Sequence, residues 1–330
     1  MAILTVPRDQ ELDALVAAFD LGSRLGSRGI EAGTVNTSYA LHLEAGRFFL
    51  RIYEEQGREG AEAEARLLRH LAASGVKTPA PMVARDGAMV RSVAGKPAAV
   101  FPWVDGEMLC LRAVTAGAAR EVGAALARMH LAGPPPDASL GPGRFQLEDL
   151  RRRCDRVRAS RDPLASASAG ALRDALTAVA ARRRSDLPTG LVHGDLFRDN
   201  VLWHEDGPLD EHDTTAPRPP RIAALLDFES AHHGPFAYDL AVTILSWSFR
   251  DTFDTDVARA VVAGYRKVRE LSQGEREGLH AEAVFAAVRF TITRITDEAI
   301  RVGKRWQRFV ARREALEQLG SSGLREMLGL

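Results

Sequence analysis

The chain has 330 residues, of which 45% are hydrophobic and 27% are charged. Lysine and arginine together number 44, as do aspartate and glutamate, so the formal net charge is zero. This composition is too apolar for a disordered protein, and the zero net charge argues against nucleic acid or an acidic membrane as the main partner. At roughly 150 residues per domain, the length predicts about two domains or lobes.

The two cysteines, Cys110 and Cys154, cannot form a disulfide framework, and no Cys/His spacing suggests a zinc site. The first residues lack the basic start and apolar stretch of a signal peptide, and no apolar run reaches the length of a membrane-spanning helix. We therefore expect a cytoplasmic protein, a monomer or dimer, with no membrane partner.

The first hundred residues predict a small sheet with one helix. Alternating apolar residues predict strands over 34–43 and 47–53, joined by a turn into a hairpin. Apolar residues at helical spacing predict a helix over 59–74, which ends at a glycine. The four glycines between 22 and 33 predict a flexible loop beside the first strand, and a short hairpin is expected around 85–87.

Helical periodicity dominates the rest of the chain. Thr115 is placed to cap the first of these helices, and helix is again expected from about residue 239 onward. Two apolar runs interrupt the helices and predict strands over 191–203 and 221–228. The acidic, proline-rich stretch between them, residues 204–220, has no apolar pattern and predicts a solvated surface insertion.

An apolar stretch that ends at Asp105 and Gly106 marks the expected boundary between two lobes. We therefore predict an α+β, bilobal protein. A small sheet-plus-helix lobe over 1–100 is followed by a connector over 101–106 and a larger, mainly helical lobe over 107–330.

Polar residues that suit phosphoryl transfer cluster in two short segments. Residues 193–200 read His-Gly-Asp-Leu-Phe-Arg-Asp-Asn, and Asp227 ends the following apolar strand. Phosphoryl transfer needs a carboxylate to hold or accept the proton of the attacking hydroxyl, and hard oxygen ligands to hold Mg²⁺ against the phosphates. Asp195, Asn200 and Asp227 supply these groups in the order seen in kinase catalytic loops.

With these motifs, nearly the whole chain resembles the aminoglycoside phosphotransferase-like kinases, which have a protein-kinase-like fold. Within that family it most resembles the homoserine kinases of threonine biosynthesis. Further matching segments are Phe49–Glu54, Arg69–Ala73, Lys96–Ala99, Arg120–His130, Tyr238–Val242 and Val288–Arg294.

The resemblance implies ATP as the phosphoryl donor and Mg²⁺ as its metal ion. It makes Asp195 the catalytic base and places Mg²⁺ on Asn200 and Asp227. The substrate is a small molecule, with L-homoserine the best candidate and O-phospho-L-homoserine the product. No nucleic acid partner is implied.

The resemblance also assigns nucleotide contacts. The phosphates lie under the loop that contains Gly29, Gly33 and Asn36, and the backbone from Phe101 to Trp103 receives adenine.

Related kinases pair a strand lysine with a helix glutamate, but this chain has Arg51 at the matching strand position. Glu64 is the expected partner rather than Glu62, because Glu64 shares a helical face with leucines and so turns inward. Arginine is cationic and can pair bidentately, but it does not replace lysine freely, which leaves the role of Arg51 open.

Four further residues are candidates for substrate contact. Arg198 is placed to reach a phosphate or to pair with an acid of its own loop, and Asp239 to orient the loop, touch substrate or cap a helix. Arg289 and Arg294 lie about 140° apart around a helix and so do not share one face. One of them is a candidate to bind a substrate carboxylate, and pairing of each with Glu282, Asp297 or Glu298 is the equal alternative.

Histidines at 193 and at 232–233 have simpler interpretations. His193 is expected to pack under the catalytic loop as a structural residue. His232 and His233 are interpreted as solvated loop residues rather than metal ligands, because no carboxylate or cysteine spacing completes a site.

Three alternative functions stay open. The first is a kinase for another hydroxylated amine, such as an aminoglycoside or a choline-like molecule, whose polycationic or cationic groups would call for an acidic pocket. The second is a protein kinase, against which the segment from Asp227 to Asp239 is short and has no Ala-Pro-Glu motif. The third is a non-catalytic nucleotide-binding module, for which the substitution at Arg51 is the one supporting feature.

Overall fold

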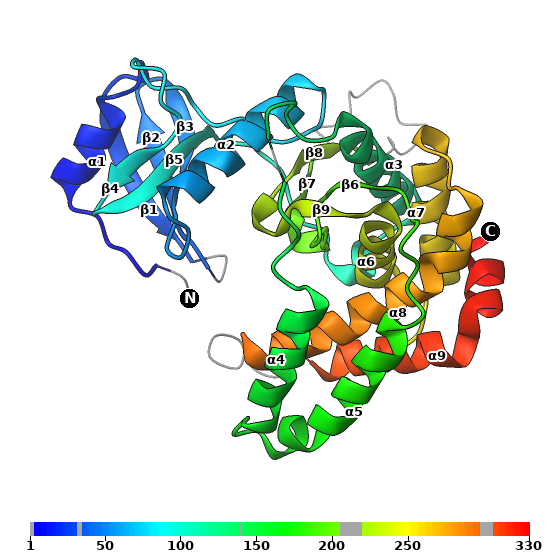
Figure 1. Ribbon diagram of the computed structural model, residues 1–330. Coiled ribbons are helices and arrows are strands. Elements are labelled where there is room, and N and C mark those ends of the chain that lie inside the picture. Colours follow the sequence, from blue (N-terminus) through cyan, green and yellow to red (C-terminus); the bar gives the residue numbers. More distant parts are fainter. Residues whose placement is uncertain (1–2, 32–34, 139, 205–219, 298–305) are drawn as a thin grey trace. The chain divides into compact units, whose positions relative to one another are not determined.

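The computed structural model describes residues 3–31, 35–138, 140–204, 220–297 and 306–330. The chain divides into two compact units. Unit 1 comprises residues 1–105 and 134–138, and unit 2 comprises residues 106–133 and 139–330. The elements of both are labelled in Figure 1.

Unit 1 is built on an antiparallel five-stranded sheet in the order β1-β2-β3-β5-β4. The strands are β1 (Arg24–Ile30), β2 (Thr37–Leu43), β3 (Gly46–Ile52), β4 (Arg91–Val93) and β5 (Lys96–Pro102). The hairpin expected from the alternating pattern is present as β2 and β3, in a register that pairs Ser38 with Arg51.

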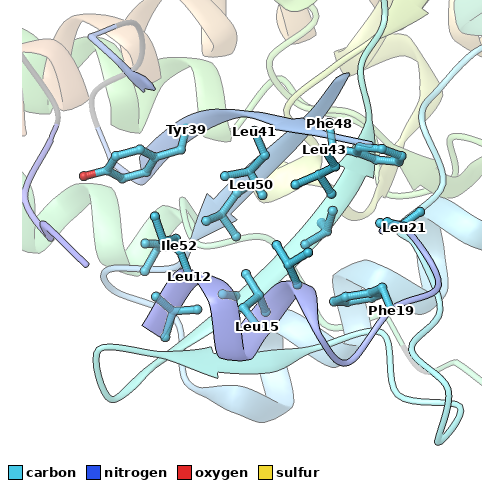
Figure 2. Close-up of a cluster of buried hydrophobic side chains, with 14 of the residues drawn as sticks. Leu12, Leu15, Phe19, Leu21, Tyr39, Leu41, Leu43, Phe48, Leu50 and Ile52 are labelled. Carbon is cyan, nitrogen blue, oxygen red and sulfur yellow. The ribbon is translucent and has the colours of Figure 1, made fainter. Parts of the chain in front are cut away.

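One face of this sheet is covered by helix α1 (Asp9–Val16). Leu12 and Leu15 of α1 face Leu41 of β2 and Leu50 of β3 in a cluster of buried apolar side chains (Figure 2). Full burial of each such leucine contributes about 2 kcal/mol, so this cluster supplies much of the unit's stability. The sequence analysis did not anticipate α1, which has only two turns.

Helix α2 (Arg58–Ala73) carries a buried stripe that includes Glu64 as well as leucines. Gly75 follows α2 with φ +83°, a backbone conformation that other residues rarely adopt. The helix therefore ends at this glycine, as the sequence predicted.

Two expectations for unit 1 were wrong in part. Gly26 and Gly29 do not lie in a loop, because Arg24–Ile30 pairs with β2 as an edge strand, and Gly33 lies outside the described residues. At Gly29 a Cβ would lie 2.4 Å from the end of the Ile3 side chain, which would have to move to make room for it. The expected turn around 85–87 is present, with the N–H of Ala84 donating to the carbonyl of Ala88, but no strands flank it in this described segment. The second hairpin of the sheet turns instead at Ala94 and Gly95, both with positive φ. Paired left-handed residues suit the tight turn of a hairpin, and the sequence analysis had overlooked them.

Unit 2 is mainly helical. Its helices are α3 (Ala116–Ala132), α4 (Leu147–Arg158), α5 (Pro163–Ala180), α6 (Phe236–Ser248), α7 (Thr255–Val268), α8 (Gln273–Thr296) and α9 (Gln307–Leu328). Thr115 caps α3 as expected, its side chain accepting a hydrogen bond from the backbone N–H of Ala118. Helices α3 and α7 cross closely at Gly123 and Gly264, where a Cβ would lie 1.9 Å from a carbonyl oxygen of the other helix.

Four short strands lie among these helices (Figure 1). β6 (Thr189–Val192) pairs with β9 (His232–Pro235), and β7 (Val201–Trp203) pairs with β8 (Ile222–Leu225). The first apolar run is therefore two strands separated by a loop, rather than one. Most of the expected surface insertion, residues 205–219, lies outside the described residues.

No helix in the described ranges has both the length and the apolar character needed to cross a membrane.

Candidate active site

The loop between β6 and β7 carries Asp195 and Asn200, and the end of β8 is followed by Asp227. Two hydrogen bonds hold these segments together. The Nε2 of His193 donates to the carbonyl of Leu226 at 3.0 Å, and the N–H of Leu226 donates to the carbonyl of Asn200 at 2.9 Å. His193 is fully buried, and this contact agrees with the structural role expected for it.

Asp239 holds the loop from below. It lies in the first turn of α6, is fully buried, and accepts the backbone N–H groups of His193 and Gly194 at 2.6 and 2.8 Å. His130 Nε2 donates a third hydrogen bond at 3.0 Å. Burial by itself raises the pKa of Asp239, but the hydrogen bonds from His130 and from the backbone of His193 outweigh it and hold that pKa below its ordinary value. Asp239 therefore orients the loop as an ionised group.

Asp195 follows in the same loop but has different surroundings. Its Oδ1 is enclosed, yet no described residue donates a hydrogen bond to it. Burial raises the pKa of Asp195, against the opposing influence of Arg289 and Arg294 on α8. A carboxylate with a raised pKa and a free acceptor atom suits a group that must hold or accept a proton.

Asp227 has an enclosed Oδ1 that also lacks a hydrogen-bond partner among the described residues. Its backbone is left-handed, with φ 60° and ψ 71°, a strained conformation that non-glycine residues adopt most readily as Asp or Asn. The amide of Asn200 donates to the carbonyl of Asp195 at 2.8 Å, which leaves its own oxygen as an acceptor.

These oxygens fit Mg²⁺. Among the residues described, no cluster of three His, Cys, Asp or Glu forms an all-protein metal site. Mg²⁺ needs none, because it is usually held by one or two protein oxygens together with phosphates and water.

Cations gather around this loop from α8, α9 and the loop itself. The guanidinium of Arg289 lies 3.9 Å from the ring centre of Phe290, and that of Arg312 lies 4.3 Å from the ring centre of Phe309. Burial, together with Arg198, Arg294 and Arg308, lowers the pKa of Arg312 to about 10. The site therefore favours an anionic ligand, and the sequence analysis did not single out Arg312.

Arg198 and Arg294 are the two other arginines among the substrate candidates. Arg198 donates at 3.4 Å to the carbonyls of Ser246 and Leu109, and no ion pair with Asp199 is present. Arg294 stands with its guanidinium 5.8 Å from the ring centre of Phe197.

In unit 1 the expected partnership of Arg51 is confirmed. Its Nη1 lies 2.9 Å from Oε1 of Glu64, and both side chains are largely buried. Asn36 accepts the backbone N–H of Glu54, and Gly29 lies in β1. Gly33 lies outside the described residues.

The segment expected to receive adenine ends strand β5. Phe101 is buried and pairs with Phe49 across the sheet. Trp103 is partly exposed, and its indole N–H donates to Asp105 at 3.1 Å.

His232 was misjudged as a solvated loop residue. It lies in β9, is largely shielded from solvent, and its Nδ1 is 2.7 Å from the carbonyl of Ser230. Nothing in the local sequence pattern marked it, because the packing partner of its ring is Gly143, far away along the chain.

Comparison with known proteins agrees with this geometry. The model described as "Phosphotransferase enzyme family" matches residues 27–274, and the chain belongs to this family. It is 35% identical over 311 residues to a homoserine kinase of Caulobacter vibrioides, with 90% of each chain covered. It is 34% identical over 306 residues to a homoserine kinase of Paramagnetospirillum magneticum, covering 90% of this chain and 89% of that one.

Solved structures show the same fold. A microcompartment-associated aminopropanol kinase superposes with a TM-score of 0.70 at 20% identity, covering 96% of this chain and 99% of that one. An amicoumacin kinase superposes with a TM-score of 0.69 at 15% identity, covering 95% and 94%. The expected protein-kinase-like α+β fold is confirmed, and the chain is a phosphotransferase that acts on a hydroxyl group.

Proposed function

We propose that this enzyme transfers the γ-phosphoryl group of ATP to the side-chain hydroxyl of L-homoserine, with Mg²⁺ as its metal ion. The observation that carries the proposal is the pair of enclosed carboxylate oxygens on Asp195 and Asp227, which have no hydrogen-bond partner among the described residues. The relatives named homoserine kinase, at 34–35% identity over most of the chain, support the choice of acceptor. The solved amicoumacin kinase, which holds AMP-PNP, supports ATP as the donor.

Asp195 is the proposed catalytic base. Its free Oδ1 accepts a hydrogen bond from the substrate hydroxyl and aligns that oxygen with the phosphorus. The raised pKa brings Asp195 closer to the proton affinity that a base needs as the hydroxyl loses its proton. Most of the rate enhancement then comes from position and charge neutralisation rather than covalent chemistry.

Asn200 and Asp227 are the proposed Mg²⁺ ligands. Bound there, the ion would neutralise charge on the phosphates. The chain's contribution is to fix both oxygens: Asn200 through its hydrogen bond to the loop, and Asp227 through its left-handed backbone.

Unit 1 is the proposed nucleotide-binding lobe. Arg51, held by Glu64, supplies the cation that a strand lysine supplies elsewhere in the family. Gly29, Gly33 and Asn36 belong to the proposed phosphate-covering segment, and the backbone from Phe101 to Trp103 to the adenine contact. We propose that the enzyme works in the cytoplasm, where ATP is available, and that it is a monomer or dimer.

The charge of unit 2 favours an amino acid over an aminoglycoside as the acceptor. A polycation needs acidic walls. The cavity of unit 2 is instead lined by Arg144, Arg183 and Arg289, with Glu229 the one carboxylate among its described lining residues. An acceptor that carries a carboxylate is attracted by this surface, whereas a polyamine is repelled.

The test is release of ADP from Mg-ATP with a panel of acceptors: L-homoserine, L-serine, L-threonine, choline and kanamycin. ADP release without acceptor gives the background. We expect turnover well above background with L-homoserine and the lowest rate with kanamycin. Preferential turnover of choline or kanamycin would replace the acceptor, and release no faster than background with all five would overturn the proposal.

A further inference from the structure

A cavity of about 260 Å³ lies within unit 2, beside the catalytic loop. Its walls are the loop that precedes α4, the segment from Glu229 to Pro235 that follows the proposed metal ligand, and the inner face of α8. Pockets for drug-sized ligands measure roughly 300–1,000 Å³, so this one suits a smaller molecule. Phe145, Tyr238 and Phe285 supply apolar walls.

Arg289 is the unusual residue of this cavity. It is only 4% exposed, and its guanidinium lies 4.0 Å from the ring centre of Phe145 and 3.9 Å from that of Phe290. In the described part of the chain no carboxylate forms an ion pair with it, and its Nε has no hydrogen-bond partner. A buried cation is costly unless it is paired, so a cavity that contains one is prepared for an anion.

Arg183, which lines the same cavity, shows the contrast. It forms a bidentate pair with Glu282, at 2.8 and 2.7 Å, and stacks 3.9 Å from the ring centre of Phe285. Its charge is therefore already neutralised. Of these two arginines, Arg289 is the one whose charge a ligand would satisfy.

His232 offers a hydrogen-bond acceptor, in contrast to the cationic arginines. Its Nδ1 lies 2.7 Å from the carbonyl of Ser230, and because a carbonyl only accepts, Nδ1 must carry the hydrogen. Burial lowers the pKa of His232, which favours the neutral ring and leaves Nε2 as an acceptor. Glu229, which is close to His232 in the sequence, also lines the cavity. An ammonium group, which only donates, is the natural ligand for such acceptors.

The His232 ring also connects the cavity to the reacting end of the site. A Cβ on Gly194, next to Asp195, would lie 3.2 Å from Cε1 of His232, and a Cβ on Gly143 would lie 2.7 Å from its ring. The ring is therefore packed between the catalytic loop and the opposite wall. One wall of the cavity therefore adjoins the residue that precedes Asp195.

We infer that this cavity binds the α-amino-acid end of the acceptor, with its carboxylate on Arg289 and its ammonium group on His232 and Glu229. The inference rests on the proposed function and deepens it. It makes Arg289 and His232 the residues that select an amino acid over a simple amino alcohol or a hydroxy acid.

The test uses two analogues that each lack one group of L-homoserine. 3-Amino-1-propanol lacks the carboxylate, and 4-hydroxybutyrate lacks the amine. Both are measured as competitors of L-homoserine, which gives an inhibition constant whether or not they are phosphorylated. The variants are Arg289→Met, Arg289→Lys and His232→Phe. Arg276→Met is the matched control, because it removes one positive charge from the same helix where it pairs with Glu270.

In Arg289→Met we expect KM for L-homoserine to rise about 10- to 100-fold, with kcat changed much less, because one charge-assisted interaction is lost. The preference for L-homoserine over 3-amino-1-propanol falls by a similar factor, and Arg289→Lys restores part of it. In His232→Phe the preference over 4-hydroxybutyrate falls instead. The melting temperature of Arg289→Met stays equal or rises, since an unpaired buried charge is removed.

An unchanged KM in Arg289→Met, or an equal loss of affinity for L-homoserine and 3-amino-1-propanol, would overturn the inference while leaving the proposed function intact. A fall in melting temperature without a change in selectivity would show a purely structural role and overturn it equally. If wild-type enzyme does not phosphorylate L-homoserine, the proposed function itself fails, and the acceptor panel separates that case from the others.

Discussion

Asp195 lies in the loop between β6 and β7, and Asp239 supports that loop through hydrogen bonds, but the two carboxylates have opposite surroundings. Asp239 accepts three hydrogen bonds from His193, Gly194 and His130, and its pKa is lowered. Asp195 has an enclosed oxygen without a partner in the described structure, and its pKa is raised. Both carboxylate oxygens of Asp239 accept hydrogen bonds within the protein, whereas one oxygen of Asp195 is available to a ligand.

This difference distinguishes a residue that positions the loop, Asp239, from the residue proposed to take part in the reaction, Asp195. A satisfied buried carboxylate contributes to stability, because each hydrogen bond to a charged group is worth about 1.5–3 kcal/mol. An unsatisfied one costs stability and is retained where a substrate or ion completes it. Substitutions that alter the two kinds of site should therefore affect activity and stability in opposite proportions.

Apart from Asp195 itself, the largest effect is expected at Asp227. Asp227→Asn keeps the left-handed backbone accessible but removes the charge proposed to bind the metal. Because a bound metal supplies several kcal/mol of charge stabilisation, we expect turnover to fall about 1,000-fold. Steady-state ADP release over a range of Mg²⁺ concentrations measures this. Asp256→Asn, at an exposed residue on α7, is the control. Near-normal turnover in Asp227→Asn would remove Asp227 from the metal site.

Next in size is Asp239→Asn. The amide offers one acceptor where the loop supplies donors to both oxygens, so a donor faces a donor. We expect the free energy of unfolding to fall by about 3 kcal/mol, together with turnover, because the loop loses its anchor. Urea unfolding checks the stability, with the exposed Asp256→Asn as control. A stable variant with normal activity would show that the loop does not depend on Asp239.

The smallest effect concerns pH. Burial lowers the pKa of His130 below its ordinary 6.5, so as the pH falls the unfolded chain takes up a proton that the folded chain does not. Stability is therefore lost below about pH 6.5, by at most about 1.4 kcal/mol per pH unit. The lowered pKa of Asp239 adds a loss of the same sign at lower pH.

His130→Gln tests this directly, because glutamine can donate to Asp239 but does not titrate. Urea unfolding at pH 7.5 and pH 5.5 should show a smaller difference in the variant than in the wild type. An equal difference in both proteins would place the acid sensitivity elsewhere.

Local patterns in the sequence predicted the parts of the fold that local physics determines. The inward position of Glu64 follows from helical periodicity, and the structure pairs it with Arg51 at 2.9 Å. Thr115 caps its helix because a hydroxyl at that position satisfies a free N–H group. The loop from His193 to Asn200 and the approach of Asp227 followed from spacing between two apolar runs.

Sequence patterns did not predict the features that depend on contacts between segments far apart along the chain. The glycine-rich segment before residue 31 became strand β1 because β2 offered it an edge, which glycine spacing cannot reveal. The packing of His232 against Gly143 depends on segments about ninety residues apart in the chain. The clustering of Arg312 with Arg198 and Arg294 likewise arises only once α9 packs near the catalytic loop.

The central claim is that Asp195 is a base left unpaired for the substrate hydroxyl. It is tested most directly by measuring kcat with L-homoserine at saturating Mg-ATP, together with the free energy of unfolding, in wild type and Asp195→Asn. The account predicts a fall in kcat of about 10²- to 10⁴-fold and no loss of stability, because the variant removes an unsatisfied buried charge. A variant that turns over at nearly the wild-type rate, or that loses stability as Asp239→Asn is expected to, would contradict it.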